Sequence, residues 1–360
     1  MDTMQSNAPV QNKKTKKQFG GKYLKQRKKR KFLSFLGKTV SFFLATVLLI
    51  AVGLVGVIYV VEKGPSTSVR DLFVRSVRET SAAGFLAEFF LTEEEIAEIE
   101  MTKSTEVPAG STDTSLIKIE KREESVSSES DAAVSEAAEE IEIIDVRGAT
   151  FKGKMMIVHD SQRVLVGVSK YLGSSGRTLE EMIGDYGAIG GVNGGGFEDD
   201  NGSGNGGIPI GIVVSEGEVL YGMSSYAPTA VIDYDGILHV GNMTGAEAKA
   251  LNARYAVSFG PILVVNGEKC DGLESGLNPR TAIGQRSDGA ILLLVVDGRQ
   301  LDSPGATYED IADVMLEFGA VNAMNLDGGS SSMMIYEGEF LTNSASIVGQ
   351  RGLPTCIIVK

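Results

Sequence analysis

Two turns rich in aspartate and glycine carry most of the side chains that could do chemistry in this chain. Asp297-Gly298-Arg299 ends one apolar run, and Asp327-Gly328-Gly329-Ser330 ends the next. Two carboxylates can share the acid, base and nucleophile roles at the anomeric carbon of a sugar, and arginine can neutralise a phosphate leaving group. Glycines here allow the backbone to approach a ligand closely. We therefore expect a site for a polar, anionic ligand, with Asp302, Ser303 and Ser331 as further polar groups.

Two other segments offer groups that could complete this site. Asn193 is followed by three glycines and comes directly after an apolar run, so its loop leaves backbone amides open to an anion or a sugar hydroxyl. Arg280 follows Pro279 at the start of a predicted strand and could fork onto phosphate or carboxylate. Taken alone, a tight turn explains the first segment, and an ion pair inside the domain explains the second equally well.

The acidic, glycine-rich loop from 198 to 207 resembles a calcium loop only in part. Its oxygen-bearing residues alternate, but no glutamate closes the loop at the EF-hand spacing and no helices flank it. We interpret it as a rim loop, and we expect neither a metal nor a cofactor. His159 and His239 are far apart in sequence, which disfavours zinc hydrolases and Ser-His-Asp enzymes. Cys270 and Cys356 could form one disulfide or remain two free thiols.

Short apolar runs separated by turn signals must position these groups. The runs include 154–158, 164–168, 189–192, 208–214, 281–284, 291–296, 322–326 and 356–359. Turns such as Asp235-Gly236 and Asp288-Gly289 separate them, as is typical of hairpins. Helices are predicted over 179–186, 246–253 and 308–318, the last with Thr307 as N-cap and Gly319 as its end. Many hairpins with few helices predict an α+β fold with mixed, mostly antiparallel sheets.

The N-terminal part predicts a membrane anchor. Residues 1–38 are strongly basic, whereas the whole chain has a net charge of −13, so phosphate backbones would repel most of it and nucleic-acid binding is disfavoured. Residues 39–61 are uncharged and apolar, and as a helix they would span roughly 34 Å, enough for a hydrocarbon core of ~30 Å. The basic flank predicts a cytoplasmic N-terminus and an extracellular C-terminal region.

Two segments separate the anchor from the C-terminal region. Residues 62–101 have apolar positions at helical spacing, which predicts a helical juxtamembrane stalk that could contact lipid, a second copy or another membrane protein. Residues 102–140 are rich in serine, glutamate and alanine, and we expect them to form a disordered acidic linker. Residues 141–360 then form the predicted globular domain.

Five motifs in this domain occur in the order found in the phosphodiester glycosidase family, which the domain resembles over about 60% of the chain. They are VNGGGF, FGPILVVNG, NPRTAIG, VDGR and NLDGGSSS. Bacterial members of this family are often labelled exopolysaccharide biosynthesis proteins. Two features depart from the family pattern: three glycines and one aromatic follow Asn193, and the loop from 198 to 207 is long and acidic.

The resemblance implies hydrolysis of a sugar-1-phosphodiester at the bond between C1 and the phosphate oxygen. Asp297 and Asp327 would serve the anomeric carbon, and Arg280 and Arg299 would hold the phosphate, with no cofactor. The remaining expected ligand contacts come from Asn193, Gly194, Ser303, Gly328, Gly329 and Ser330. The substrate would be a glycan or sugar phosphate of the cell envelope.

Two alternatives from other classes stay open at this point. A non-catalytic envelope scaffold would bind glycan in the same site without turnover. A transferase would attach a polymer through a phosphodiester, and analysis of free against transferred sugar would separate it from a hydrolase.

Overall fold

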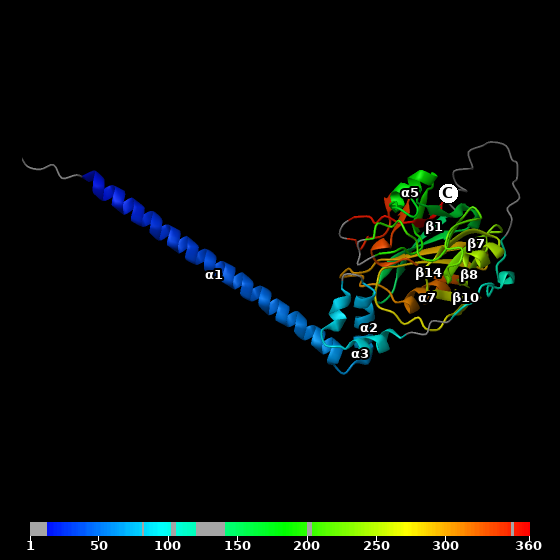
Figure 1. Cartoon of the computed structure of the whole chain (residues 1–360), viewed down its shortest axis with the longest axis horizontal. Helices are drawn as coiled ribbons and strands as arrows, with labels where there is room; N and C mark the ends of the chain where they lie inside the picture. The colour runs from blue at the N-terminus through cyan, green and yellow to red at the C-terminus, as the bar shows by residue number, and fades with distance from the viewer. Residues whose placement is uncertain (1–12, 81–82, 102–105, 120–140, 200–203, 347–348) are drawn as a thin grey trace, which may run out of the picture. The chain divides into compact units, whose positions relative to one another are not determined.

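Figure 1 shows a computed structural model of the chain, which describes residues 13–80, 83–101, 106–119, 141–199, 204–346 and 349–360. Residues Met1–Val61 and Glu62–Lys360 form two compact units, and each is considered by itself. The first twelve residues of the basic tail, most of the predicted linker and residues 200–203 of the acidic loop lie outside the described residues.

The first unit consists of a long helix, α1 (Lys13–Lys63). Its part from Arg27 to Lys63 contains an 18-residue window with a mean hydropathy of 2.8. Within the described ranges it is the one helix that is long and apolar enough to cross a membrane, a property that an anchor and a signal sequence share. The predicted span of 39–61 lies inside this helix.

The second unit contains three antiparallel sheets, which confirms the predicted α+β class. The seven-stranded sheet has the order β1 (Ile141–Arg147), β2 (Lys152–Val158), β13 (Ile291–Val296), β12 (Arg280–Arg286), β14 (Ala320–Leu326), β10 (Ile262–Val265), β11 (Glu268–Lys269). The second sheet has the order β16 (Glu339–Phe340), β15 (Met334–Tyr336), β4 (Gly190–Asn193), β17 (Thr355–Val359), β3 (Val164–Val168). The third has the order β6 (Glu218–Tyr221), β5 (Val213–Ser215), β9 (Ala253–Ser258), β7 (Ala227–Asp233), β8 (Leu238–Met243).

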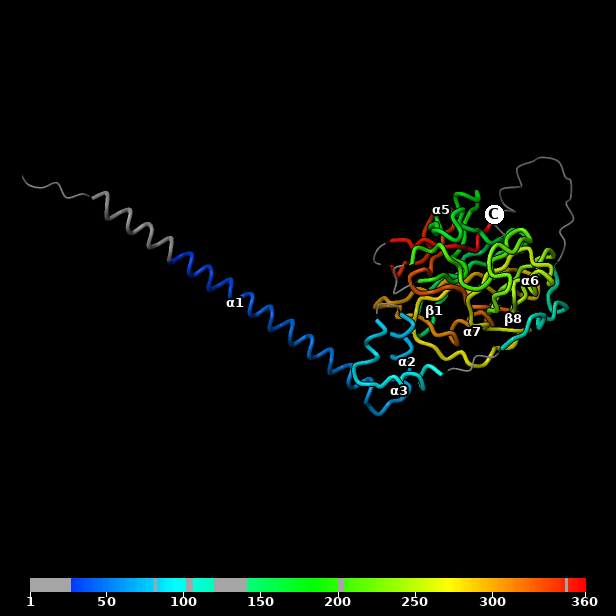
Figure 2. Tube along the Cα trace, in the orientation of Figure 1, coloured from blue at the N-terminus to red at the C-terminus, as the bar shows by residue number. Residues whose placement is uncertain are grey.

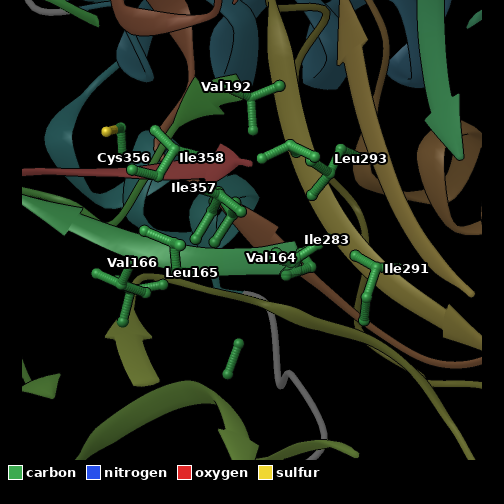
Figure 3. Packing of buried hydrophobic residues seen from close by; sticks show 14 of the residues in the cluster. Val164, Leu165, Val166, Val192, Ile283, Ile291, Leu293, Cys356, Ile357 and Ile358 are labelled. Atoms are coloured by element: carbon green, nitrogen blue, oxygen red, sulfur yellow. The ribbon is translucent and has the colours of Figure 1, made fainter. Parts of the chain in front are cut away.

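The seven-stranded sheet is covered on both faces, which explains the continuous apolar sequence of β13. Side chains alternate between the faces of a strand. Ile291, Leu293 and Val295 belong to the core shared with β3, β4 and β17, and Figure 3 shows Leu293 near Val192 and Ile358. Leu292, Leu294 and Val296 belong to a separate core with helix α7 (Tyr308–Glu317). Both faces are therefore dry, and the centre of this sheet is a rigid base for residues at its strand ends.

Helix α7 follows the predicted bounds closely. Thr307 accepts a hydrogen bond from the backbone N–H of Asp310, and the side chain of Asp310 in turn accepts one from the N–H of Thr307, which forms a capping box. Gly319 adopts a φ of 84°, a conformation that glycine takes without strain and that ends the helix. The described residues also form the short α-helices α5 (Leu179–Tyr186) and α6 (Gly245–Ala250).

One predicted strand is much shorter than expected. The apolar run 208–214 forms a strand only from Val213, and before that Pro209 makes a single bridge to Phe197. Proline cannot donate a ladder hydrogen bond, so the run starts as a loop. The two cysteines are free thiols, and the buried Cys356 Sγ lies 3.7 Å from Met182 Sδ.

The prediction of one disordered linker over 102–140 is wrong for residues 106–119. Val107 and Ile117 are buried in the second unit, and Pro108 pairs with Asn242 of β8. Figure 2 draws this segment as a turquoise trace along the edge of the domain near the label β8. The composition of the segment is polar overall, so these two isolated apolar residues gave no recognisable pattern in the sequence. The segment 62–101 forms helices α2 (Thr67–Arg78), η1 (Gly84–Glu88) and α3 (Glu93–Glu100). The Ser76 hydroxyl of α2 accepts a hydrogen bond from Leu277 in the loop before β12.

Candidate active site

The register of three neighbouring strands brings Arg280, Asp297 and Asp327 to one end of the seven-stranded sheet. Arg280 lies opposite Val296, the last residue of β13, and Thr281 lies opposite Leu326, the last residue of β14. Adjacent strands are about 4.8 Å apart, so the three residues start within roughly two strand spacings of each other. The two aspartate turns and the arginine segment therefore meet at one edge.

Asn193, at the end of β4, joins this edge to the second sheet. Its side chain is fully buried, and its Nδ2 donates to the backbone oxygen of Asp327 at 2.5 Å. Its Oδ1 accepts from the Thr281 hydroxyl at 2.8 Å and from the Met333 backbone N–H at 3.1 Å. The neighbouring Gly194 oxygen accepts from the Asp327 N–H. Asn193 and Gly194 thus hold Asp327 and β12 in place through internal hydrogen bonds.

The carboxyl group of Asp327 is electrostatically unusual. Burial raises its pKa to about 6, although the Ser331 hydroxyl, the Gly328 N–H and the charge of Arg351 act to lower it. Oδ1 accepts from the Gly328 N–H at 2.9 Å, whereas Oδ2 is buried without a well-aligned hydrogen bond from the described part of the chain. A carboxyl group with a pKa near neutrality can give or take a proton at physiological pH.

Asp297 is in a different environment, because both of its oxygens are occupied by one residue. The backbone N–H of Asn343 donates to Oδ1 at 2.8 Å, and Asn343 Nδ2 donates to Oδ2 at 2.9 Å. Ser303 donates its hydroxyl to the Asp297 backbone oxygen and accepts from the Lys152 N–H, so its side chain holds the turn. Asp297 is 5% exposed, and its carboxylate fixes the loop around Asn343.

The two arginines are held by different means. Arg280 is buried, and its guanidinium lies 4.0 Å from the centre of the Tyr308 ring. It donates to the backbone oxygens of Ala306 and Gly276 and to the carboxylate of Glu79 at 2.6 Å. Arg299 has a left-handed φ of 58° and lies at the surface, with Nη2 donating to Asn278 Oδ1.

The charges of these arginines influence one another. Although Arg299 as a whole residue is exposed, the protein atoms around its guanidinium displace water from it. This desolvation and the positive charge of Arg280 lower the pKa of Arg299, while Glu79 acts to raise it. Gly329 permits the close arrangement, since a Cβ there would lie 3.2 Å from Arg299 Nη2. Gly328 similarly approaches the backbone oxygen of Pro279. Two clustered guanidinium groups at the sheet end that also carries Asp327 form an arrangement suited to an anionic substrate.

Residues 186–360 match the family model of phosphodiester glycosidases. These residues form a phosphodiester glycosidase domain. The match covers the candidate site described above, from Asn193 to Arg351.

Two curated proteins are similar to the chain over limited lengths. The SPbeta prophage-derived uncharacterized protein YomE of Bacillus subtilis is 31% identical over 199 residues, which cover 51% of this chain and 30% of that protein. The bovine N-acetylglucosamine-1-phosphodiester alpha-N-acetylglucosaminidase is 39% identical over 62 residues, 17% of this chain and 12% of that protein. The chain therefore spans less than a third of either curated relative.

A solved structure shares the fold of the phosphodiester glycosidase domain. It is the zebrafish N-acetylglucosamine-1-phosphodiester alpha-N-acetylglucosaminidase catalytic domain auto-inhibited by pro-peptide, with a TM-score of 0.50 and 21% identity. The likeness covers 61% of this chain and 81% of that one.

Sequence reasoning missed three residues of the candidate site, namely Arg351, Asn343 and Glu79. Arg351 donates to the Ser330 hydroxyl at 3.1 Å and forms two hydrogen bonds to Asp199, at 2.9 and 3.1 Å. The hydrogen bonds from Arg351 and Gly204 outweigh burial and lower the pKa of Asp199. Asn343 and Glu79 complete the set. Asn343 and Arg351 lie in the polar segment before the last strand, and their residue types could have indicated a role in the site. No sequence feature near Glu79 points to this site.

Proposed function

We propose that the chain is a membrane-anchored hydrolase that cleaves a sugar-1-phosphodiester in a cell-envelope or exopolysaccharide glycan. The bond between C1 and the phosphate oxygen breaks, and its electron pair stays on that oxygen. Water supplies a hydroxyl group to C1, and the products are a sugar and a phosphomonoester. The observation that carries this proposal is that Asp327, whose pKa is about 6, lies at the same end of the seven-stranded sheet as the clustered Arg280 and Arg299.

The roles follow from the contacts that each group makes. Arg280 and Arg299 neutralise the phosphate, which is already a good leaving group and depends more on charge neutralisation than on a strong acid. Asp327 serves the anomeric carbon, because one of its oxygens is free of well-aligned hydrogen bonds from described residues. Asp297 acts as a positioning residue through Asn343, and Ser330 presents its hydroxyl beside Arg351.

The membrane location rests on α1 and its flanks. The apolar part of this helix follows a basic segment, and such segments stay on the cytoplasmic side of a membrane. The phosphodiester glycosidase domain then lies outside the cell, attached through a single span. This places it where polymers of the envelope are within reach.

Isotope labelling tests the reaction directly. The full chain in detergent is incubated in ¹⁸O-labelled water with a methyl diester of N-acetylglucosamine 1-phosphate, and the phosphomonoester product is weighed by mass spectrometry. Cleavage at C1 leaves the phosphate unlabelled. Label in the phosphate would mean attack at phosphorus and would refute the proposed bond cleavage.

A matched diester that is linked through the sugar 6-hydroxyl controls for specificity, because it has the same charge but no anomeric bond to phosphate. We expect turnover of the 1-linked diester alone. Equal turnover of both diesters, or turnover of neither, would contradict cleavage of a sugar-1-phosphodiester at C1.

A further inference from the structure

Residues at the end of helix α2 are seated tightly on the loop that precedes Arg280. The Ser76 hydroxyl accepts a hydrogen bond from the Leu277 N–H at 2.8 Å. A Cβ at Gly276 would lie 2.2 Å from the Ser76 Cα, so only glycine permits this approach. Thr80 accepts a hydrogen bond from Arg299 Nη2 at 3.1 Å. The segment therefore contacts both arginines of the candidate site, through Glu79 and Thr80.

Glu79 places a carboxylate on three hydrogen-bond donors of this loop. Its Oε1 accepts from the Gly276 backbone N–H at 2.8 Å. Its Oε2 accepts from Asn278 Nδ2 at 3.0 Å and from Arg280 Nη2 at 2.6 Å. A backbone amide, a side-chain amide and a guanidinium that converge on two anionic oxygens also suit the two non-bridging oxygens of a phosphodiester, which carry the same single charge.

The helical segment that carries Glu79 has a small core of its own. Val74, Ala87, Leu91, Ile96 and Ile99 pack together, separately from the cores of the sheets. Its hydrogen bonds with the loop before β12 come from Ser76, Glu79 and Thr80, beside the close backbone contact at Gly276. The buried residues of this small core do not belong to the cores of the sheets.

The packing around Glu79 is incomplete. A cavity of about 310 Å³ lies between the helical segment and the domain, lined by Arg75, Glu79, Glu100, Pro261, Gly272, Glu274 and Tyr308. Small, polar interfaces between parts of a chain permit relative motion more readily than large, apolar ones.

We propose that Gly276, Asn278 and Arg280 form the phosphate subsite and that Glu79 occupies it as an intramolecular competitor of the phosphodiester. The proposal rests on the proposed function for the identity of the competing ligand. Glu79 is not placed as a nucleophile, since both of its oxygens are bound by the three donors. Substrate entry then requires Glu79 to leave, so α2 sets the apparent affinity of the enzyme for its substrate.

The first test compares phosphate binding by two matched variants of the full chain in detergent. Glu79→Gln keeps the side-chain length and removes the charge, and Glu98→Gln makes the same change at an exposed position of α3. Isothermal titration with inorganic phosphate should show an affinity at least about tenfold higher for Glu79→Gln, because a charge-assisted hydrogen bond no longer competes. Equal or weaker binding by Glu79→Gln would overturn the proposal.

The second test uses the unmodified chain, so it does not depend on how a variant folds. Hydrogen–deuterium exchange is measured over residues 67–80 with and without saturating inorganic phosphate. Displacement of Glu79 predicts faster exchange in α2 when phosphate is bound. Unchanged or slower exchange would show that phosphate and Glu79 do not share a subsite.

The two proposals fail in distinguishable ways. Tighter phosphate binding by Glu79→Gln without hydrolysis of any sugar-1-phosphodiester would refute the proposed function and support the subsite. Hydrolysis of a sugar-1-phosphodiester, together with equal phosphate affinities of Glu79→Gln and Glu98→Gln, would support the proposed function and refute the subsite.

Discussion

Replacing Asp327 with asparagine should stabilise the protein at high pH and at the same time lower kcat by orders of magnitude. Burial raises the pKa of Asp327 from 3.8 to about 6. The folded state therefore holds this proton more tightly than the unfolded state does, and stability falls as pH rises from about 4 through about 6. A difference of about two units corresponds to about 3 kcal/mol of destabilisation above that window.

The asparagine of the Asp327→Asn variant carries no charge at any pH, so it does not incur this cost. One of its amide atoms would take the place of the buried Oδ2, and leaving that atom without a partner costs about 1 kcal/mol. The net gain at pH 8 is about 2 kcal/mol, which raises the Tm of a domain of this size by about 4–8 °C. At pH 4 the gain should vanish, because the wild-type carboxyl is then protonated in the folded state.

The assay is thermal unfolding of the wild type and Asp327→Asn at pH 4 and pH 8, with kcat measured alongside. Asp235→Asn, at an exposed turn, is the control for general effects of removing a negative charge. Loss of a proton-transfer group lowers kcat by about 10²–10⁴-fold. A stability difference that does not change with pH, or that matches Asp235→Asn, would refute the assigned environment of Asp327.

Three further substitutions test the frame around the candidate site. Asn193→Ala leaves the Thr281 hydroxyl, the Met333 N–H and the Asp327 carbonyl without their hydrogen-bond partner. The free energy of unfolding, measured in urea, should therefore fall by about 3 kcal/mol. A fall of less than about 1 kcal/mol would contradict the role of Asn193 in holding these groups. Arg280→Lys cannot form the same set of hydrogen bonds or stack on Tyr308, and kcat/KM should fall at least about tenfold, whereas Arg286→Lys at the other end of β12 should leave it unchanged. Arg351→Gln removes a positive charge that lowers the pKa of Asp327, so the inflection of the pH–rate profile should move above about pH 6. An inflection at an unchanged or lower pH would count against this coupling.

Signals that lie close together in sequence predict the fold class and the position of Arg280, Asp297 and Asp327 at one sheet edge. Alternating faces and turn glycines identified the strands, and a capping residue with a following glycine gave the bounds of α7. Once β12, β13 and β14 are neighbours, the strand register alone brings Arg280, Asp297 and Asp327 to one edge. This much of the candidate site could be predicted because it depends on where apolar runs end.

The partners of these residues could not be predicted, because tertiary packing sets them. Glu79 and Arg280 are 201 residues apart, and the pair of Arg351 with Asp199 is 152 residues apart. Neither pair has a periodic or spaced pattern in the sequence. The same limit applies to Val107 and Ile117, whose burial depends on grooves that other parts of the chain form.

Because of Asn193, activity depends on how the seven-stranded sheet and the second sheet fit together. It ends β4 of the second sheet, and its amide holds both Asp327 and Thr281 of the seven-stranded sheet. Any partly unfolded form in which these sheets separate loses the carboxyl placement at once, even if each sheet keeps its own hydrogen bonds. On heating, inactivation should therefore precede or coincide with the loss of sheet structure, and a thermally loosened yet active intermediate is not expected.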